Sequence, residues 1–419
     1  MIEGLSTLAQ YPYGCCEQAY SSTLPNYILW SYMKNQEVLD EEFMVKLKNH
    51  MIYGKNLFMN SYRRSDGGFS LWSSGDSSVF HTALVLSLFG LLSKAIEVDP
   101  NVLKQSVDFL KSKQDSKGCW TPGSFTYTVP FPDTTLSTIG ITSYIFHGAA
   151  LAGVLLSESL VWLKENLFLN RYDTTCVALV LDGISRLNLQ KSEQKIFCEN
   201  IRLILLNDQN ENGSWGDAEN PGSSLSGVTE STAYAIMALI HSFPEDEEVI
   251  SSVKKAVDYL LKIRRGTGWS TTRDTLYASW AIGEAGDVLW KPKQSHITIL
   301  VNGETRKSFD FDPKNKNSVD VLCQMREVHI DKLNEDANTI QVQSSGCECS
   351  ILFEIKRYFM DNKKHQEKVD NEVFTAQWQE TKLDVGQRVS LRLSYNPRSP
   401  ANALMVEIPI PSGFEIDSL

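Results

Sequence analysis

The sequence lacks the features of proteins that bind nucleic acids or span membranes. It has 40 basic and 51 acidic residues and a formal net charge of −11, so no surplus of positive charge is present for phosphate backbones or anionic lipids. No stretch approaches the roughly 20 apolar residues of a membrane-spanning helix. The segment from Met1 to Gly4 also lacks the basic and apolar regions of a secretory signal peptide. We therefore expect no nucleic-acid partner and no membrane span.

Cysteine is scarce as well. Eight cysteines in 419 residues are too few for a fold held together by disulfides. Cys176 and Cys198 lie in apolar helical patterns, where a buried thiol is expected. Cys323, Cys347 and Cys349 share a β-rich region, and one of the last two could pair with the first. Such a bridge would indicate an oxidising compartment.

Helical patterns with an apolar face fill the chain up to about Trp290. The loops between them share a polar-glycine-aromatic pattern, with glycines that recur at a period of about 50 residues. A turn of this kind followed by a helix predicts one helical hairpin used repeatedly, and five or six such hairpins can close into an α/α ring. We expect the loop tryptophans to fill the packing between hairpins. The loops are RSDGGFSLW, DSKGCW, NENGSW and RRGTGW, which end at Trp72, Trp120, Trp215 and Trp269.

Alternating patterns typical of β-strands begin after Lys291-Pro292-Lys293. A first set, from HITILVNG to ILFEIKRYF, precedes a charged linker at Asp361 to Asp370. A second set, FTAQWQE, RVSLRLSY and ALMVEIPI, follows it and has the extent of an incomplete domain. We therefore expect three parts, 1–290, 291–362 and 363–419, and we expect the chain to be a piece of a longer protein.

The stretch YPYGCCEQ, Tyr11 to Gln18, places a thiol close to a carboxamide. Cys15 and Gln18 are separated by three positions, so they share one face of a helix that begins after Pro12. Attack of the Cys15 sulfur on the Gln18 carbonyl, with loss of ammonia, would form an internal thioester. Such a bond is a stored acyl electrophile that must be kept from water and amines. Tyr11 and Tyr13 could shield it, and simple core packing is the alternative for both rings.

Other kinds of chemistry find less support in the sequence. A catalytic cysteine needs a histidine base, and His81 and His147 lie in helical patterns where a packed histidine is expected. Zinc needs about four Cys or His ligands at paired spacing, which the helical part does not offer. Helical rings that act as terpene cyclases carry acidic clusters such as DxDD, whereas the densest acidic run here, Glu245 to Glu248, is explained by a helix start. We expect no metal, no other cofactor and no enzymatic turnover.

The motif PYGCCEQ, followed by an apolar helix with LPNYILWSYM, resembles the thioester region of the α2-macroglobulin and complement superfamily. Val228 to Ile240 and Trp269 to Gly286 resemble helices of that family's α/α-toroid thioester domain. Lys293 to Phe359 is similar to the second half of the CUB domain that follows the toroid. RVSLRLSYNPRSPANALMVEIPIPSGF resembles the start of the receptor-binding macroglobulin domain. The resemblance implies an α/α toroid followed by antiparallel β-sandwich parts, CUB-like and then macroglobulin-like.

Carried onto this chain, the resemblance makes Cys15 the sulfur donor of the thioester and Gln18 the acyl donor. Glu17 matches the family's glutamate, and Gly14 belongs to the same turn. Cys16 is a departure, because the family has glycine there. Its side chain adds steric demand inside the thioester ring and supplies a rival thiol.

A second departure concerns acyl transfer. Complement members that esterify hydroxyl groups carry a histidine in the loop after the third hairpin's glycine-aromatic turn. The matching stretch, Gly118 to Phe131, has none, and Tyr127 or Thr128 falls near that place. An ordinary loop aromatic is the alternative for Tyr127. Without imidazole, the thioester should react directly with good nucleophiles, above all lysine amines.

The resemblance therefore implies a secreted protein, or a periplasmic one if bacterial, that traps attacking proteinases or microbial and cell surfaces covalently through lysine amines. The C-terminal β-domain could bind a cell-surface receptor. A complement-like opsonin is one alternative, and a homologue that has lost the thioester and acts as a binding or adhesion scaffold is the other.

Overall fold

The computed structural model describes 14–35, 40–121, 134–168, 173–189, 194–216, 226–265, 268–289, 294–312, 314–315, 321, 338–346, 374–378 and 391–395. It describes the backbone alone for 134–137, 287, 374–378 and 391–395. The chain divides into two compact units, 1–354 and 355–419. The predicted domain boundaries at 290 and 362 stay predictions.

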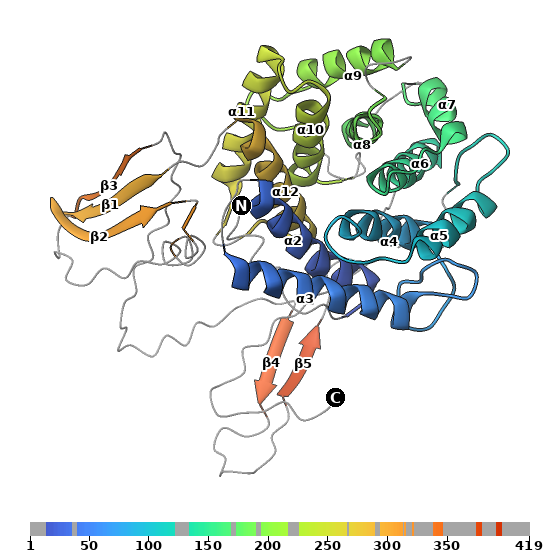
Figure 1. Cartoon of the computed structure of the whole chain (residues 1–419), viewed down its shortest axis with the longest axis horizontal. Helices are drawn as coiled ribbons and strands as arrows, with labels where there is room; N and C mark the ends of the chain where they lie inside the picture. The colour runs from blue at the N-terminus through green and yellow to red at the C-terminus, as the bar shows by residue number, and fades with distance from the viewer. Residues whose placement is uncertain are drawn as a thin grey trace. The chain divides into compact units, whose positions relative to one another are not determined.

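Six helices form a closed inner ring in the first unit (Figure 1). Each packs on the next in chain order, and the last packs on the first. The inner helices are α2 (Cys16–Asn35), α4 (Val79–Leu92), α6 (Thr134–Leu151), α8 (Thr174–Arg186), α10 (Val228–Ser242) and α12 (Thr272–Leu289). Five described helices lie outside them, α3 (Glu41–Leu57), α5 (Pro100–Ser112), α7 (Ser157–Asn166), α9 (Lys195–Asn207) and α11 (Glu247–Ile263). A short π-helix, η1 (Phe58–Tyr62), continues α3. This arrangement is the α/α toroid that the sequence predicts.

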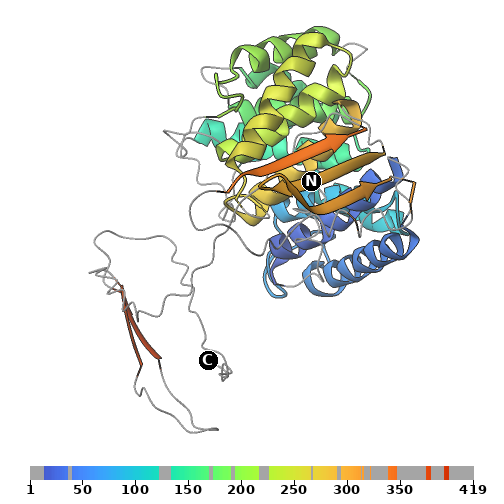
Figure 2. The ribbon, with the colours of Figure 1, turned by 90° about the vertical axis from the view of Figure 1, so that its left-hand side faces the viewer.

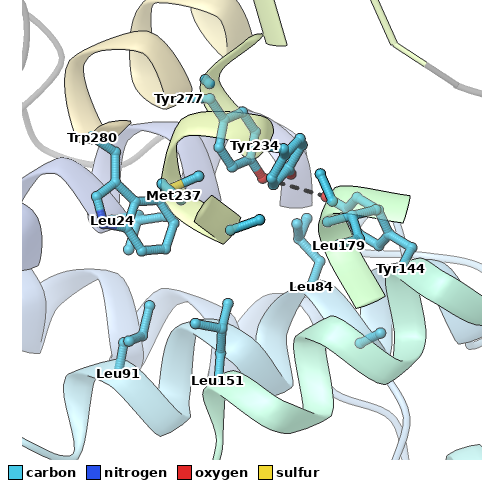
Figure 3. Packing of buried hydrophobic residues seen from close by; sticks show 14 of the residues in the cluster. Leu24, Leu84, Leu91, Tyr144, Leu151, Leu179, Tyr234, Met237, Tyr277 and Trp280 are labelled. Carbon is cyan, nitrogen blue, oxygen red and sulfur yellow. Dashed lines mark hydrogen bonds between the residues drawn. The ribbon is translucent and has the colours of Figure 1, made fainter. Parts of the chain in front are cut away.

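Burial follows the position of each helix in the ring. Every residue of α4 from Phe80 to Leu92 is buried, because the helix has neighbours on all sides. The outer helix α11 buries residues at spacings of three and four along one face, from Val249 to Leu260, and leaves the other face to solvent. Figure 3 shows Leu24, Leu84 and Leu151, which lie on three inner helices, among the residues of the buried core. Among the described residues, no helix is both long and apolar enough to cross a membrane.

The acidic run Glu245 to Glu248 begins a helix, as expected. Asp246 caps α11 by accepting hydrogen bonds from the backbone of Glu248 and Val249, both at 3.0 Å. Arg202 of α9 also pairs with Asp246 at 2.6 Å. Asp246 of this run therefore caps α11 and joins it to the neighbouring outer helix α9.

The loop tryptophans have the predicted structural role in three of the four loops. In each case the indole N–H donates to a carbonyl of the preceding outer helix, and the backbone N–H donates to a threonine hydroxyl of the following inner helix. Trp120 donates to Leu110 and Thr142 at 2.9 and 3.2 Å, Trp215 to Leu205 and Thr232 at 2.7 and 3.0 Å, and Trp269 to Leu260 and Thr275 at 2.9 Å each.

The prediction is wrong for Trp72. Phe69 occupies the equivalent position in the first loop, where it is fully buried and its N–H donates to the hydroxyl of Thr82 at 2.9 Å. Trp72 lies three residues further along and is 56% exposed. The smaller ring of Phe69 completes the packing between the hairpins, so the indole has no place in the core.

The β-rich region forms antiparallel pairs. β1 (Ser295–Val301) lies between β2 (Glu304–Phe311) and β3 (Ile340–Ser345), as the three adjacent strands in Figure 2 show. A turn at Asn302-Gly303, both with positive φ, joins β1 to β2. In the second unit, β4 (Phe374–Trp378) pairs with β5 (Leu391–Tyr395). The predicted sandwiches stay predictions, and Cys323, Cys347 and Cys349 lie outside the described residues.

Candidate functional site

The thiol and the carboxamide meet at the start of α2. Cys15 is the residue before the first helical position, and its backbone N–H donates to the Oε1 atom of Gln18 at 2.9 Å. A glutamine at the third helical position that bonds back to the residue before the helix forms half of a capping box. The local chemistry of a helix start therefore folds the Gln18 carbonyl back toward Cys15.

Gly14 makes room for this carbonyl. Its φ of +86° is in the left-handed region that favours glycine, and a β-carbon there would lie 2.1 Å from Oε1 of Gln18 and 2.9 Å from its carbonyl carbon. The glycine of the motif is thus required twice, by its backbone angle and by the approach of the acyl group.

A loop before α4 holds the turn in place. The Tyr62 hydroxyl donates to the carbonyl of Gly14, and the backbone N–H of Cys16 donates to the carbonyl of Leu71 at 2.9 Å. Burial raises the pKa of the Tyr62 hydroxyl, and the neighbouring Cys16 and Cys15 raise it further, so Tyr62 remains a donor at neutral pH. The start of α2 is therefore fixed from the outer side by residues 62–71.

The two adjacent thiols have different surroundings. Cys15 is 9% exposed and lies next to the exposed Gln18, whereas Cys16 is fully buried. Burial raises the pKa of the Cys16 thiol well above its usual value, with smaller contributions from Cys15 and Glu17. Glu17 is half-buried. Burial and the raised pKa both favour the neutral thiol at Cys16.

Tyr11, Tyr13 and Tyr127 lie outside the described residues. Cys176 and Cys198 are buried, as expected. Among the described residues there is no group of three or more Cys, His, Asp or Glu side chains that could hold a metal ion.

The two helical histidines are packed, as expected. His81 on α4 is 3% exposed, neither ring nitrogen has a hydrogen-bond partner within the described structure, and burial lowers its pKa to about 4. His147 on α6 bonds through Nε2 to Asp182 of α8 at 2.7 Å.

His147 belongs to an ion cluster that joins four inner helices and that was not predicted from the sequence. We define the ion cluster as His147, Asp182, Arg186, His241 and Glu284. Asp182 accepts His241 Nδ1 at 2.6 Å, and Glu284 accepts His241 Nε2 and Arg186 Nη2, both at 2.9 Å.

The charges of the ion cluster support one another. Burial alone would raise the pKa of Asp182, but Arg186 and His241 hold it well below its usual value. Burial and Arg186 would lower the pKa of His241, but Glu284 and Asp182 raise it to about 9. Charged residues within apolar helices were the available signal in the sequence.

Comparisons with known proteins identify similar sequences. Residues 1–160 match the family model of the A-macroglobulin TED domain. The whole chain is 23% identical to thioester-containing protein 1 allele S1 of Anopheles gambiae and covers 30% of it. Alpha-2-macroglobulin-like protein 1 of Mus musculus is 23% identical over 83% of the chain and 24% of its own length. Ovostatin of Gallus gallus is 21% identical over 75% of the chain and 22% of its own length.

The chain thus spans less than a third of the curated relatives that it matches. The matched residues include the Cys15 to Gln18 turn and the first helices of the toroid. The match of residues 1–160 and these similarities support the superfamily of α2-macroglobulin and complement thioester-containing proteins.

Proposed function

We propose that Cys15 and Gln18 form an internal thioester through which the parent protein captures a target covalently. The observation that carries this proposal is the hydrogen bond of 2.9 Å that folds the Gln18 carbonyl back on Cys15, in a turn that only Gly14 accommodates. The burial of Cys16 supports Cys15 as the sulfur donor.

The reaction needs only groups of this chain and an amine. The Cys15 sulfur attacks the Gln18 carbonyl carbon, the C–N bond breaks, and the amide nitrogen leaves as ammonia with the thiol proton. A target amine later attacks the same carbon, so a C–N bond forms, the C–S bond breaks, and the thiolate takes up the surplus proton of the amine. Each molecule reacts once, which makes it a trap rather than an enzyme.

Lysine amines are the proposed acceptors. The sequence from Gly118 to Phe131 contains no histidine that could take the acyl group and pass it to a hydroxyl. His81 is 3% exposed on α4, and His147 is bonded to Asp182. Direct aminolysis favours trapping of proteinases, the role proposed for the secreted parent protein, over a complement-like opsonin. Receptor binding through the C-terminal β-domain is part of the same proposal.

Counting thiols before and after methylamine treatment tests the assignment of the sulfur. The wild-type chain should release one new thiol, Cys15→Ser should release none, and Cys16→Gly, which restores the family's residue, should still release one. A third variant, Cys16→Ser, tests the rival thiol. If Cys16→Ser released no thiol while Cys15→Ser still released one, the sulfur donor would be Cys16 and not Cys15. A folded chain that never releases a thiol would instead support the binding or adhesion scaffold.

A further inference from the structure

Tyr62 is a buried tyrosine whose hydroxyl reaches the turn from Gly14 to Gln18. Its side chain is 3% exposed, and its ring packs on Phe58 with 5.6 Å between the ring centroids. The hydroxyl donates to the backbone carbonyl of Gly14. Packing accounts for the ring, but it does not account for a hydroxyl that bonds to the turn, because the apolar ring alone would fill the space.

The backbone that carries Tyr62 has an unusual local structure. Tyr62 is the last residue of η1, and the N–H of Arg63 donates to the carbonyl of Phe58, five residues back, at 3.1 Å. Such π-helical turns are rare and occur frequently at functional sites. The carbonyl of Tyr62 also accepts the backbone N–H and the hydroxyl of Ser70, at 3.0 and 3.2 Å. The phenol is therefore held on a fixed backbone.

The carbonyl of Gly14 and the N–H of Cys15 belong to one peptide group. The carbonyl accepts the Tyr62 hydroxyl, and the N–H donates to Oε1 of Gln18 at 2.9 Å. Because the peptide group is planar, holding the carbonyl also sets the direction of the N–H. Hydrogen bonds in series polarise one another, so donation to the carbonyl makes the N–H a stronger donor. We call this series of two hydrogen bonds the Tyr62 relay.

The relay ends on the atom where negative charge develops. When the Cys15 sulfur adds to the carbonyl carbon of Gln18, the π electron pair of the carbonyl moves to Oε1. The thiol proton passes to the amide nitrogen, which leaves as ammonia when the carbonyl re-forms. The Cys15 nitrogen already lies 2.9 Å from Oε1, within the range of an oxyanion donor. The backbone N–H of the nucleophilic residue has the same role in serine proteases.

We propose that Tyr62 is a positioning residue for the acyl chemistry of Gln18. Its hydroxyl orients and polarises the peptide between Gly14 and Cys15, so that the Cys15 N–H stabilises the oxyanion on Oε1. This inference rests on the proposed function. The same oxyanion forms when an amine opens the thioester, so the relay acts both in forming the bond and in transferring the acyl group.

The rate of thiol release by ammonia tests the relay, because this reaction is the reverse of thioester formation and passes through the same oxyanion. Tyr62→Phe keeps the ring and removes only the hydroxyl. It should slow thiol release about three- to tenfold, the effect of one ordinary hydrogen bond. The control Tyr53→Phe removes the hydroxyl of an exposed tyrosine on α3 and should leave the rate unchanged. A rate in Tyr62→Phe that equals or exceeds that of wild type would overturn the proposal.

A Tyr62→Phe chain that carries no thioester also decides the question, if its helical circular dichroism equals that of wild type. The mass of the peptide that contains residue 18 is then measured. Unreacted glutamine would mean that the bond does not form without the hydroxyl, which supports the proposal. Glutamate, the product of hydrolysis, would mean that the bond had formed and that Tyr62 only protects it, which overturns the proposal.

The amide proton of Cys15 reports on the relay without any reaction. Chains with isotopically labelled cysteine are treated with ammonia, which returns Gln18 to the carboxamide, and the Cys15 resonance is assigned by its absence in Cys15→Ser. A weaker hydrogen bond to Gln18 should shift this proton upfield in Tyr62→Phe and not in Tyr53→Phe. If wild type releases no thiol, the proposed function fails and the role of Tyr62 with it. Thiol release by wild type with an unmoved Cys15 resonance in Tyr62→Phe would refute the relay alone.

Discussion

Replacing His81 by leucine should make the toroid more resistant to acid. His81 is 3% exposed on the inner helix α4, and neither ring nitrogen has a hydrogen-bond partner among the described residues. Nothing in this site compensates the charge of a protonated imidazole. Burial accordingly lowers the pKa of His81 from 6.5 to about 4.

The size of the effect follows from this shift. A histidine whose pKa is lower in the folded state takes up its proton first in the unfolded state, so stability falls as the pH drops from 6.5 toward 4. At about 1.4 kcal/mol for each pKa unit, the loss across the whole window is about 3 kcal/mol. Above the unfolded pKa, the neutral ring contributes nothing to the pH dependence.

The pH dependence of stability is measured by urea unfolding of wild type, His81→Leu and His81→Gln. Unfolding is followed by the helical circular dichroism signal at several values between about pH 7 and pH 4. Glutamine is the polar control that cannot titrate. Relative to wild type, both variants should gain about 2 to 3 kcal/mol toward the acidic end. Carboxylates are common to all three chains and cancel in this difference, so only His81 can make it vary with pH. A difference that stays constant with pH would mean that the pKa of His81 is not lowered by folding.

Three further predictions concern the turn, the ion cluster and the loops. Gly14→Ala should abolish methylamine-induced thiol release, because a β-carbon would lie 2.1 Å from the acyl-donor amide, whereas Gly75→Ala, which also has a positive φ but no atom within 4 Å of the new β-carbon, should retain it. Asp182→Asn should lower the free energy of unfolding by about 3 to 5 kcal/mol in urea titrations, because Arg186 and His241 lose the more deeply buried of their two carboxylate partners, Asp182 and Glu284; a loss below about 1 kcal/mol would contradict its role. Trp215→Ala should lower the free energy of unfolding by about 3 to 5 kcal/mol, whereas Trp72→Ala should lower it by less than about 0.5 kcal/mol. Similar losses in the two variants would contradict the different packing of the two indoles.

The ring of helices could be predicted from the sequence because its signals are local. The amphipathic periods predict the helices, and the glycine-aromatic turns predict the repeated helical hairpin. The site could be predicted for the same reason, since Cys15 and Gln18 are only three residues apart and a helix start brings them together.

The role of Trp72 could not be predicted, because it depends on a distant partner. Both Phe69 and Trp72 follow the glycines of their loop, and only the hydrogen bond of Phe69 to Thr82 shows which ring enters the packing. The separation from the aromatic to its threonine is 13 residues there but 22 at Trp120. No fixed spacing therefore marks the pair.

The ion cluster was missed for a related reason. A helical pattern indicates that His147 is buried, but its partner Asp182 lies 35 residues away on another inner helix, and Asp182 in turn bonds to His241 of a third. Sequence patterns record the period of one helix and carry no information on which charges of separate helices face one another.

A thioester between Cys15 and Gln18 would be detected by the intact mass of the native chain before and after methylamine, with the modified residue identified by peptide mapping. A mass short by one ammonia, followed by uptake of one methylamine at Gln18, is the predicted result. The full mass predicted from the sequence, without methylamine uptake by the folded chain, would contradict a thioester between Cys15 and Gln18.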